Sequence, residues 1–279
     1  MKNIIVVTGA SSGLGREFVR QLDAMGADEI WGIALEEGLQ DEIQKEITTK
    51  FKYFALDLTK EESFEEYKSA LKRNKVNVTV LVNCSGFGKF GRYDEIAVST
   101  SANMIDLNCK ALVKMTGYTL PFMTEGARIM QISSVAAFQP IPYIATYGAT
   151  KAFVLSYSRA LNVELKPRGI SVTCVCPFWT KTNFFKRAII TKHDVVSKYT
   201  VMYDSRFVVS YAIDRAMKRK ELAIPGYKAR KQVRMVKFAS HKTVMNMWVK
   251  QQGLDKKYKD KPLQNLEYPT SKTKTAKKK

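Results

Sequence analysis

The segment YGATKAF (residues 147–153) places a tyrosine and a lysine four positions apart in a helical pattern. Residues at i and i+4 share a helix face, so Tyr147 and Lys151 are expected to be neighbours. An unperturbed tyrosine has a pKa of about 10, and a nearby ammonium group lowers this pKa by favouring the phenolate. The pair is therefore a candidate acid–base centre in which Tyr147 exchanges a proton with a substrate oxygen. The alternative is a helix face that carries both residues without a chemical role.

Two polar residues earlier in the chain could belong to the same centre. Ser134 follows the apolar run 127–132, and a hydroxyl at the carboxyl end of a central strand can hydrogen-bond a substrate oxygen. Asn108 lies in an apolar helical stretch, where asparagine is unfavourable, so a structural or proton-relay task is expected. Each residue alone could be a capping serine or a buried asparagine bonded to the backbone. Their occurrence together with Tyr147 and Lys151 favours a catalytic site.

A glycine-rich turn, TGASSGLG (residues 8–15), joins the first apolar run to a helical segment. The backbone N–H groups at the start of such a helix can bind a pyrophosphate, so the turn is a candidate dinucleotide site. Its residues in the predicted site are Gly9, Ser11, Ser12, Gly13, Leu14 and Gly15. A glycine turn without a ligand is the alternative.

Two later loops follow predicted strands and could contact the same ligand. Asp57 closes the run 51–56. Its carboxylate could accept a hydrogen bond from an adenine amino group, or Asp57 or Thr59 could cap the next helix. The segment 83–91 contains three glycines, which would let the backbone approach a flat ligand closely. The predicted cofactor site accordingly includes Leu58, Asn83, Cys84, Ser85 and Gly86.

Short apolar runs rich in β-branched residues alternate with helical segments along the chain. The runs are residues 3–8, 29–34, 51–56, 77–82, 127–132, 170–175 and 221–224. This alternation predicts an α/β fold, with a doubly wound parallel sheet between two layers of helices. Because the runs are continuously apolar, both faces of the sheet are expected to be buried.

The chain has 279 residues, which fits one α/β domain with an extension. Its net charge of +20 is concentrated after residue 214, where the chain contains 20 Lys and Arg residues but only 4 Asp and Glu residues. We expect a catalytic domain over 1–225, a basic helical segment over 226–254 and a disordered Lys-rich tail over 255–279. The basic segment could cap the substrate pocket, lie weakly on an anionic membrane or be a solvated helix. No module for specific nucleic-acid recognition is seen.

Cysteine use and the chain ends favour a cytoplasmic location. The four cysteines lack the spacing of a disulfide framework or a zinc site, which fits a reducing compartment and predicts no metal. The N-terminus does not have the pattern of a signal peptide. No apolar run reaches the roughly 18 residues of a transmembrane helix, so none is expected.

Together these motifs resemble the short-chain dehydrogenase/reductase family over about residues 3–225. The family's glycine motif matches the 8–15 turn, and its adenine-site acid matches Asp57. Its catalytic tetrad matches Asn108, Ser134, Tyr147 and Lys151. The resemblance implies a Rossmann-type fold, a homodimer or homotetramer, and hydride transfer between a nicotinamide and a carbonyl or carbinol carbon.

The same resemblance implies a role for each member of the tetrad. Tyr147 would exchange the proton, and Lys151 would lower its pKa and bind the nicotinamide ribose. Ser134 would orient the substrate oxygen, and Asn108 would hold a water that relays protons.

Two motifs depart from the family pattern. The NNAG element reads NCSG at 83–86, and the PG motif reads PFWTKT at 177–182. Phe178 replaces a glycine beside the nicotinamide, whereas Thr182 matches the residue that bonds the carboxamide. The predicted cofactor site is completed by Pro177, Phe178, Thr180 and Thr182.

The end of the second predicted strand favours NAD(H) over NADP(H). Leu35 stands where many relatives carry Arg or Asp, and Glu36 and Glu37 follow it. Two carboxylates would repel a 2′-phosphate, which is usually bound by arginine. Ser12 is also not the basic residue that NADP-preferring relatives often have. Arg16, just after the glycine turn, is the residue that could still reach a phosphate.

Aromatic residues near these motifs predict a bulky apolar alcohol or ketone, such as a hydroxysteroid or an acyl-chain ketone. The candidates for the pocket are Phe87, Phe90, Phe138, Tyr143, Phe178, Trp179, Phe184 and Phe185. Residues 182–205 are expected to form a lid. The alternative function is a dinucleotide-sensing or membrane-associated scaffold protein of the same fold with weak catalysis.

Overall fold

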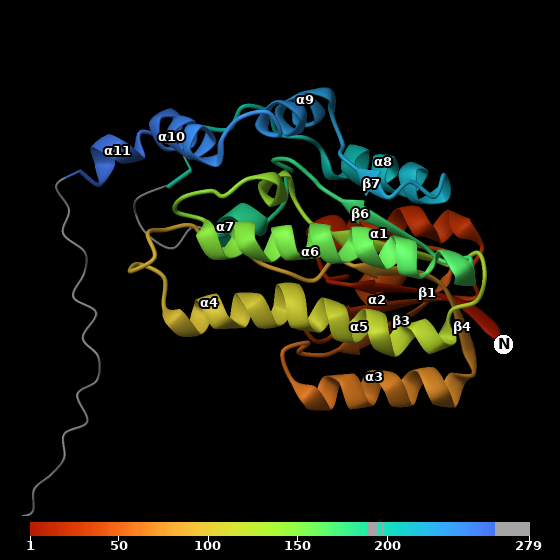
Figure 1. Cartoon of the computed structure of the whole chain (residues 1–279). Helices are drawn as coiled ribbons and strands as arrows, with labels where there is room; N and C mark the ends of the chain where they lie inside the picture. Colours follow the sequence, from red (N-terminus) through yellow and green to blue (C-terminus); the bar gives the residue numbers. More distant parts are fainter. Residues whose placement is uncertain (189–194, 197, 260–279) are drawn as a thin grey trace, which may run out of the picture.

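The computed structural model describes residues 1–188, 195–196 and 198–259 (Figure 1). Within these residues, seven parallel strands form one sheet in the order β3-β2-β1-β4-β5-β6-β7. The strands are β1 Lys2–Thr8, β2 Glu29–Ala34, β3 Lys50–Ala55, β4 Val76–Asn83, β5 Arg128–Ile132, β6 Ser171–Val175 and β7 Leu222–Ala223. Each predicted strand is confirmed to within one or two residues, and the strand order confirms a doubly wound Rossmann-type sheet.

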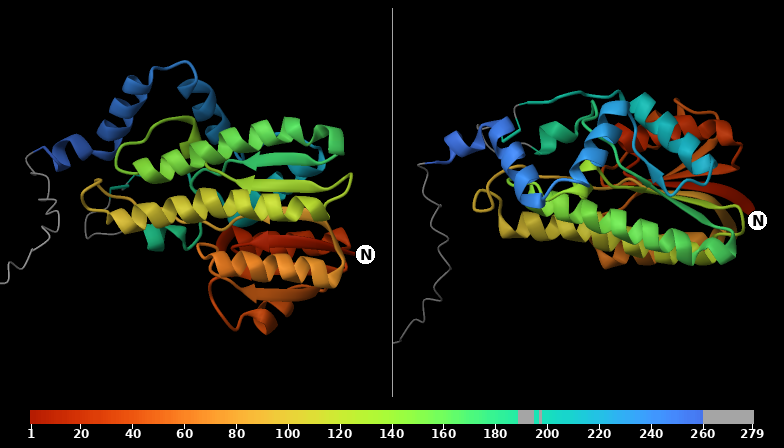
Figure 2. Two further views of the ribbon diagram at one scale, coloured as in Figure 1. Left: turned by 60° about the horizontal axis from the view of Figure 1, so that its bottom comes forward. Right: turned by 45° about the horizontal axis from the view of Figure 1, so that its top comes forward.

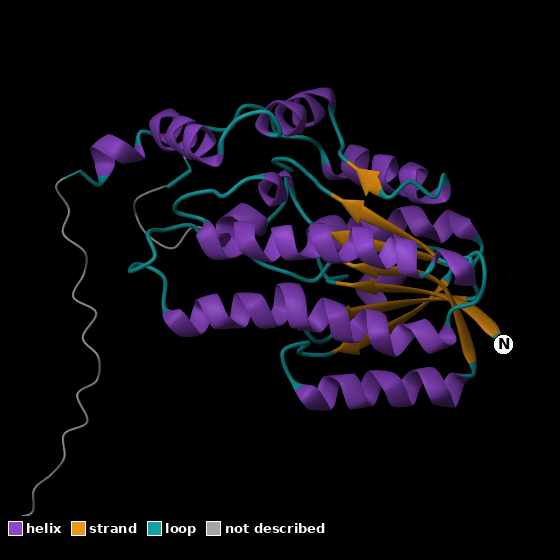
Figure 3. Cartoon of the chain, in the orientation of Figure 1, coloured by secondary structure: helices purple, strands orange, loops and turns teal. Residues whose placement is uncertain are grey.

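Helices cover both faces of the sheet (Figure 3). One face carries α3 (Glu61–Asn74), α5 (Leu112–Thr119) and α6 (Ala145–Glu164). The other carries α1 (Gly13–Leu22), α2 (Gln40–Gln44) and α8 (Ser205–Met217). Successive side chains of β1 point to opposite faces, so Ile4 packs in the first layer and Ile5 in the second. Burial on both sides explains why this strand is continuously apolar.

Shorter elements complete the domain. They are η1 Asp23–Met25, α4 Val98–Ile105, the π-helical turn η2 Asp106–Ala111, η3 Leu120–Phe122, η4 Val135–Phe138, η5 Lys166–Arg168 and α7 Phe184–Ala188. The chain order of the strands reverses between β1 and β4, which are neighbours in the sheet. The carboxyl ends at such a reversal are the usual ligand site of an open α/β sheet.

The predicted basic helical segment is two helices rather than one, α9 (Tyr227–Val236) and α10 (His241–Gln252). A third, α11 (Leu254–Lys257), follows. The predicted disordered tail, 255–279, therefore begins too early, because α11 continues to Lys257 and the Tyr258 ring stacks on Tyr143 with 4.8 Å between ring centres. The rest of that tail, 260–279, lies outside the described residues. Among the helices that are described, none is long and apolar enough to cross a bilayer.

Candidate active site

A cavity of about 970 Å³ runs along the carboxyl ends of the strands. Most predicted site residues line it, namely Gly9, Ser11, Ser12, Gly13, Leu14, Gly15, Leu35, Asp57, Leu58, Cys84, Ser85, Gly86, Ser134, Tyr147, Lys151, Pro177, Phe178, Thr180 and Thr182. Asn83 and Asn108 do not. The fold therefore brings segments from across 170 positions of sequence to one concave surface.

The glycine turn is shaped by close backbone contacts that exclude side chains. Gly9 has a φ of +71°, and a Cβ there would lie 3.0 Å from the backbone nitrogen of Ser85. A Cβ at Gly15 would lie 2.0 Å from the carbonyl oxygen of Gly9. The Ser12 side chain does not cap α1, so the first amide groups of this helix remain available to an anion. The turn therefore fits a dinucleotide pyrophosphate.

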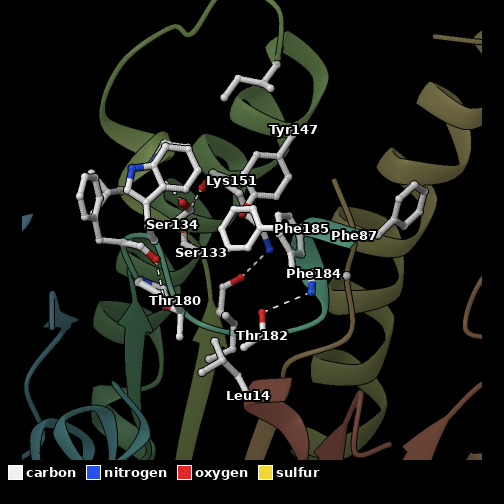
Figure 4. A pocket seen from close by; sticks show the side chains of 18 of the residues that line it. Leu14, Phe87, Ser133, Ser134, Tyr147, Lys151, Thr180, Thr182, Phe184 and Phe185 are labelled. Atoms are coloured by element: carbon white, nitrogen blue, oxygen red, sulfur yellow. Dashed lines mark hydrogen bonds between the residues drawn. The ribbon is translucent and has the colours of Figure 1, made fainter. Parts of the chain in front are cut away.

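Tyr147, Lys151 and Ser134 meet where β5 ends beside α6 (Figure 4). The Lys151 Nζ lies 5.6 Å from the centre of the Tyr147 ring and donates a 2.9 Å hydrogen bond to the Ile132 carbonyl. The Ser133 hydroxyl donates a 2.7 Å hydrogen bond to the Lys151 carbonyl. These two bonds run in opposite directions between strand and helix, so they fix the lysine relative to the strand end.

The protonation of this pair differs from the sequence prediction. Burial raises the pKa of Tyr147 to about 12, and a hydrogen bond with Ser134 lowers it only in part. Burial also lowers the pKa of Lys151. The phenolate loses its hydration when the ring is buried, and this desolvation is the largest cause of the Tyr147 shift. Tyr147 therefore carries its proton at neutral pH, which is the form that an acid catalyst needs.

The Tyr147 ring is held by close packing. It lies 5.5 Å from the Phe184 ring and 6.4 Å from the Phe90 ring, centre to centre. A Cβ at Gly88 would lie 2.9 Å from the tyrosine ring. Gly88 was expected to let backbone approach a ligand, but in this structure it lets backbone approach the side chain of Tyr147.

Asn108 lies in the π-helical turn and positions the loop after β4. Its Oδ1 accepts a 3.0 Å hydrogen bond from the Phe87 amide, and its Nδ2 donates to the Phe87 carbonyl at 2.9 Å. The Nδ2 also donates to Thr150 Oγ1 at 3.1 Å, and that hydroxyl donates to the Tyr147 carbonyl at 2.8 Å. The side chain thus connects the loop to the helix of the tyrosine. That Asn108 also holds a water which relays protons stays a prediction.

Asn83 was expected at the cofactor, and its position corrects that expectation. It is buried behind the cavity wall, where its Nδ2 donates to Thr116 Oγ1 at 3.0 Å and to Gln131 Oε1 at 2.9 Å. Thr116 belongs to α5 and Gln131 to β5. Asn83 therefore joins two strands and a helix instead of contacting a ligand.

Asp57 lies at the cavity wall and forms a local turn. Its Oδ1 accepts hydrogen bonds from the Thr59 amide at 2.9 Å and the Thr59 hydroxyl at 2.7 Å. Helix α3 begins at Glu61 with Lys60 as its N-cap residue. The alternative in which Asp57 or Thr59 caps this helix is therefore wrong.

Of the residues expected near the adenosine ribose, some line the cavity and one does not. Leu35 and Glu36 line the cavity. Arg16 does not, because its side chain is buried in ion pairs with Glu42 and Glu46, both at 2.8 Å. No local sequence pattern indicates this pairing, since the two glutamates lie 26 and 30 positions away from Arg16.

The substrate end of the cavity contains six of the eight predicted aromatic residues. Phe138 packs outside it against α9, and Tyr143 stacks on Tyr258. Side chains that were not predicted also line it: Ile141, Ile144, Lys228, Lys231, Gln232, Met235, Val236, Val244, Met247, Trp248 and Gln251. In α10 the lining residues follow the spacing i, i+3, i+4, i+7, a helical pattern that could have identified them. The wall from α9 and α10 agrees with the prediction that the basic segment caps the pocket.

Comparison with known proteins identifies the family. The family model for short chain dehydrogenase matches residues 3–192. Very-long-chain 3-oxoacyl-CoA reductase of Bos taurus is 33% identical over 193 residues, which cover 65% of this chain and 60% of that protein. The match therefore spans less than two thirds of the bovine protein.

Two further proteins are similar. Sulfoacetaldehyde reductase 2 of Chromohalobacter salexigens is 32% identical, over 66% of this chain and 75% of that protein. The structure of a short-chain dehydrogenase from Sphingobium yanoikuyae in complex with NADPH has a TM-score of 0.71 and 25% identity, and the match covers 94% of this chain and 99% of that one. The chain therefore belongs to the short-chain dehydrogenase family, whose members are oxidoreductases.

Proposed function

We propose that this protein interconverts a secondary alcohol and a ketone, using a nicotinamide dinucleotide and Tyr147 as the acid–base group. The observation that carries the proposal is the meeting of Tyr147, Ser134 and Lys151 in one cavity with the glycine turn. The dinucleotide, bound along this edge of the sheet, would supply or accept the hydride. The amide groups at the start of α1 would hold its pyrophosphate.

The side chains of the site account for the proton. In ketone reduction, Tyr147 donates its phenolic proton to the carbonyl oxygen as negative charge develops there. Ser134, which is hydrogen-bonded to Tyr147, donates a hydrogen bond to the same oxygen. Lys151 lies beside the ring and stabilises the phenolate that remains. Because burial keeps Tyr147 protonated, the structure favours reduction near neutral pH, and oxidation is expected to become faster as pH rises.

The proposed substrate is an acyl-chain ketone. The cavity wall around Tyr147 is largely aromatic and aliphatic, which suits a long apolar group. The similarity to a protein named as a 3-oxoacyl-CoA reductase points in the same direction. A hydroxysteroid is the other bulky substrate to test.

NAD(H) is proposed as the preferred cofactor. Leu35 and Glu36 line the cavity and offer no cation for a 2′-phosphate. Arg16 is already paired with Glu42 and Glu46, so turning it toward a phosphate would break two charge-assisted contacts.

A cytoplasmic homodimer or homotetramer is proposed as the working form. Helices α4 and α6, which flank the site, carry large apolar side chains that are exposed in the single chain. Ile105 is 51% exposed, Phe153 43% and Val163 67%. Burial of these side chains against a second copy would be favourable.

The test compares the wild-type chain with Tyr147→Phe. Both are titrated with NADH and NADPH by nicotinamide fluorescence and then assayed with a 3-oxoacyl thioester and with hydroxysteroids. We expect Tyr147→Phe to bind cofactor normally and to lose turnover by about 1,000-fold, the usual size of an acid–base contribution. Retained turnover in the variant would overturn the role of Tyr147. Absence of binding by either cofactor would favour the scaffold alternative.

A further inference from the structure

Helices α9 and α10 form a hairpin, residues 227–252, over the substrate end of the cavity (Figure 2). Ala229 and Val233 of α9 are buried against η4 and fasten this arm. Trp248 of α10 donates a 3.0 Å hydrogen bond from its indole nitrogen to the Pro142 carbonyl. The hairpin is therefore a fixed wall of the cavity and not a solvated appendage.

The outer side of the hairpin exposes large apolar side chains. Met235 is 58% exposed and Met247 60%, although both also line the cavity. Phe238, in the segment that links the two helices, is 88% exposed. The two methionines thus belong to the mouth of the cavity, and the phenylalanine follows α9 in the link to α10. An exposed apolar group beside a pocket mouth marks a contact surface.

The hairpin as a whole is strongly basic, although Lys228 and Lys231 also line the cavity and Arg230 lies over the Tyr211 ring. Residues 227–250 contain seven Lys and Arg residues and no Asp or Glu. All seven are exposed: Lys228, Arg230, Lys231, Arg234, Lys237, Lys242 and Lys250. A helical surface with exposed apolar side chains among cations is the pattern of an interfacial membrane contact.

We propose that the α9–α10 hairpin docks on an anionic lipid surface, so that the cavity opens toward the membrane. Phe238, Met235 and Met247 enter the interface, and the surrounding lysines and arginines contact lipid phosphates and carboxylates. An apolar ketone dissolved in the lipid could then reach the cavity without crossing water. The docking surface does not depend on which ketone is reduced.

A lipid surface fits this face better than a second copy of the chain. A symmetric dimer through the hairpin would place the same basic side chains of both copies together, which is repulsive. It would also cover the mouth that Met235 and Met247 form. A bilayer with anionic headgroups supplies both the negative charge and the apolar phase that the hairpin lacks.

The test is co-sedimentation of the full chain with vesicles of phosphatidylcholine alone and with added phosphatidylserine. We expect binding only to the anionic vesicles, and loss of it in about 0.5 M NaCl, where the Debye length is about 4 Å. Lys237→Glu with Lys242→Glu should weaken binding by about 30-fold or more, which corresponds to about 1 kcal/mol per lysine removed. Phe238→Ser should weaken it by about 5-fold.

Matched variants separate this surface from general basic charge. Lys72→Glu with Arg73→Glu reverses two exposed charges on α3, and Met217→Ser removes an exposed apolar group at the end of α8. Both should bind vesicles as the wild-type chain does. Lysines in 260–279 are common to every variant and cancel in the comparison. The proposal would be overturned if the α3 variant lost as much vesicle binding as the hairpin variant, or if the wild-type chain bound neutral and anionic vesicles equally. It would also be overturned if Phe238→Ser changed only self-association and not vesicle binding. Since the assay needs no turnover, its failure would leave the proposed reaction untouched.

Discussion

At the carboxyl edge of the sheet, Tyr147 and Lys151 are packed, hydrogen-bonded and perturbed in pKa by burial. On the α9–α10 hairpin, across the same cavity, Phe238 and Met247 are exposed among cations without carboxylates. Proton transfer at the edge needs accurately positioned groups, so a small displacement of one side chain would slow it. The hairpin needs only to enclose a large apolar group and to present the mouth of the cavity. Under the proposed function, the reaction takes place at the edge, and the hairpin controls access and substrate choice.

The largest effect is expected from Lys151→Met, which changes the edge alone. This substitution removes the cation beside the Tyr147 phenolate and the donor to the Ile132 carbonyl. Turnover should fall by about 1,000-fold, and NADH affinity should fall too, unlike in Tyr147→Phe. Steady-state rates and fluorescence titration measure both. Turnover within tenfold of wild type would mean that the edge is not the reactive region.

Trp248→Ala should change the hairpin alone. Trp248 contacts Pro142 and lies 6.5 Å from the Trp179 ring, centre to centre, so its loss should open the apolar wall. We expect the KM for an acyl-chain ketone to rise by about 30-fold, the effect of losing most of a large buried side chain. NADH affinity should stay the same. Asn246→Ala, on the exposed face of the same helix, is the control, and an equal KM change in it would contradict the assignment.

Leu35→Arg tests the cofactor end of the edge. Leu35 is 67% exposed and lines the cavity, so an arginine there can reach a 2′-phosphate without displacing the core. NADPH affinity should increase by about tenfold, since one charged hydrogen bond contributes about 1.5 kcal/mol. Glu37→Arg, exposed but outside the cavity lining, should have little effect. If both arginines act equally, general charge and not position sets the preference.

The smallest effect is expected from Glu46→Gln, which acts on stability. Hydrogen bonds from Arg16 and Arg20 lower the pKa of Glu46 to about 2. A carboxyl with a depressed pKa stabilises the fold above its unfolded value of about 4.5, and this contribution is lost as pH falls toward 2. The variant should therefore be less stable at neutral pH and show a shallower acid transition by circular dichroism. Glu62→Gln on α3 is the matched control and should retain the wild-type transition.

The sequence by itself determined the sheet, the glycine turn and the spacing of Tyr147 and Lys151. Strands buried on both faces must be continuously apolar, so their positions follow from local composition. A helix fixes which residues share a face, so Tyr147 and Lys151 are neighbours whatever packs around them. These features depend only on neighbours within a few positions.

Tertiary structure decided the features that depend on partners far away in sequence. Burial reversed the expected direction of the Tyr147 pKa shift, and pairing with Thr116 and Gln131 drew Asn83 away from the cavity. Glu42 and Glu46 form ion pairs with Arg16 and hold it away from the cavity. The aromatic cluster around Trp248 packs the hairpin against the domain. Desolvation and pairing are set by what surrounds a group in space, which local sequence patterns do not contain.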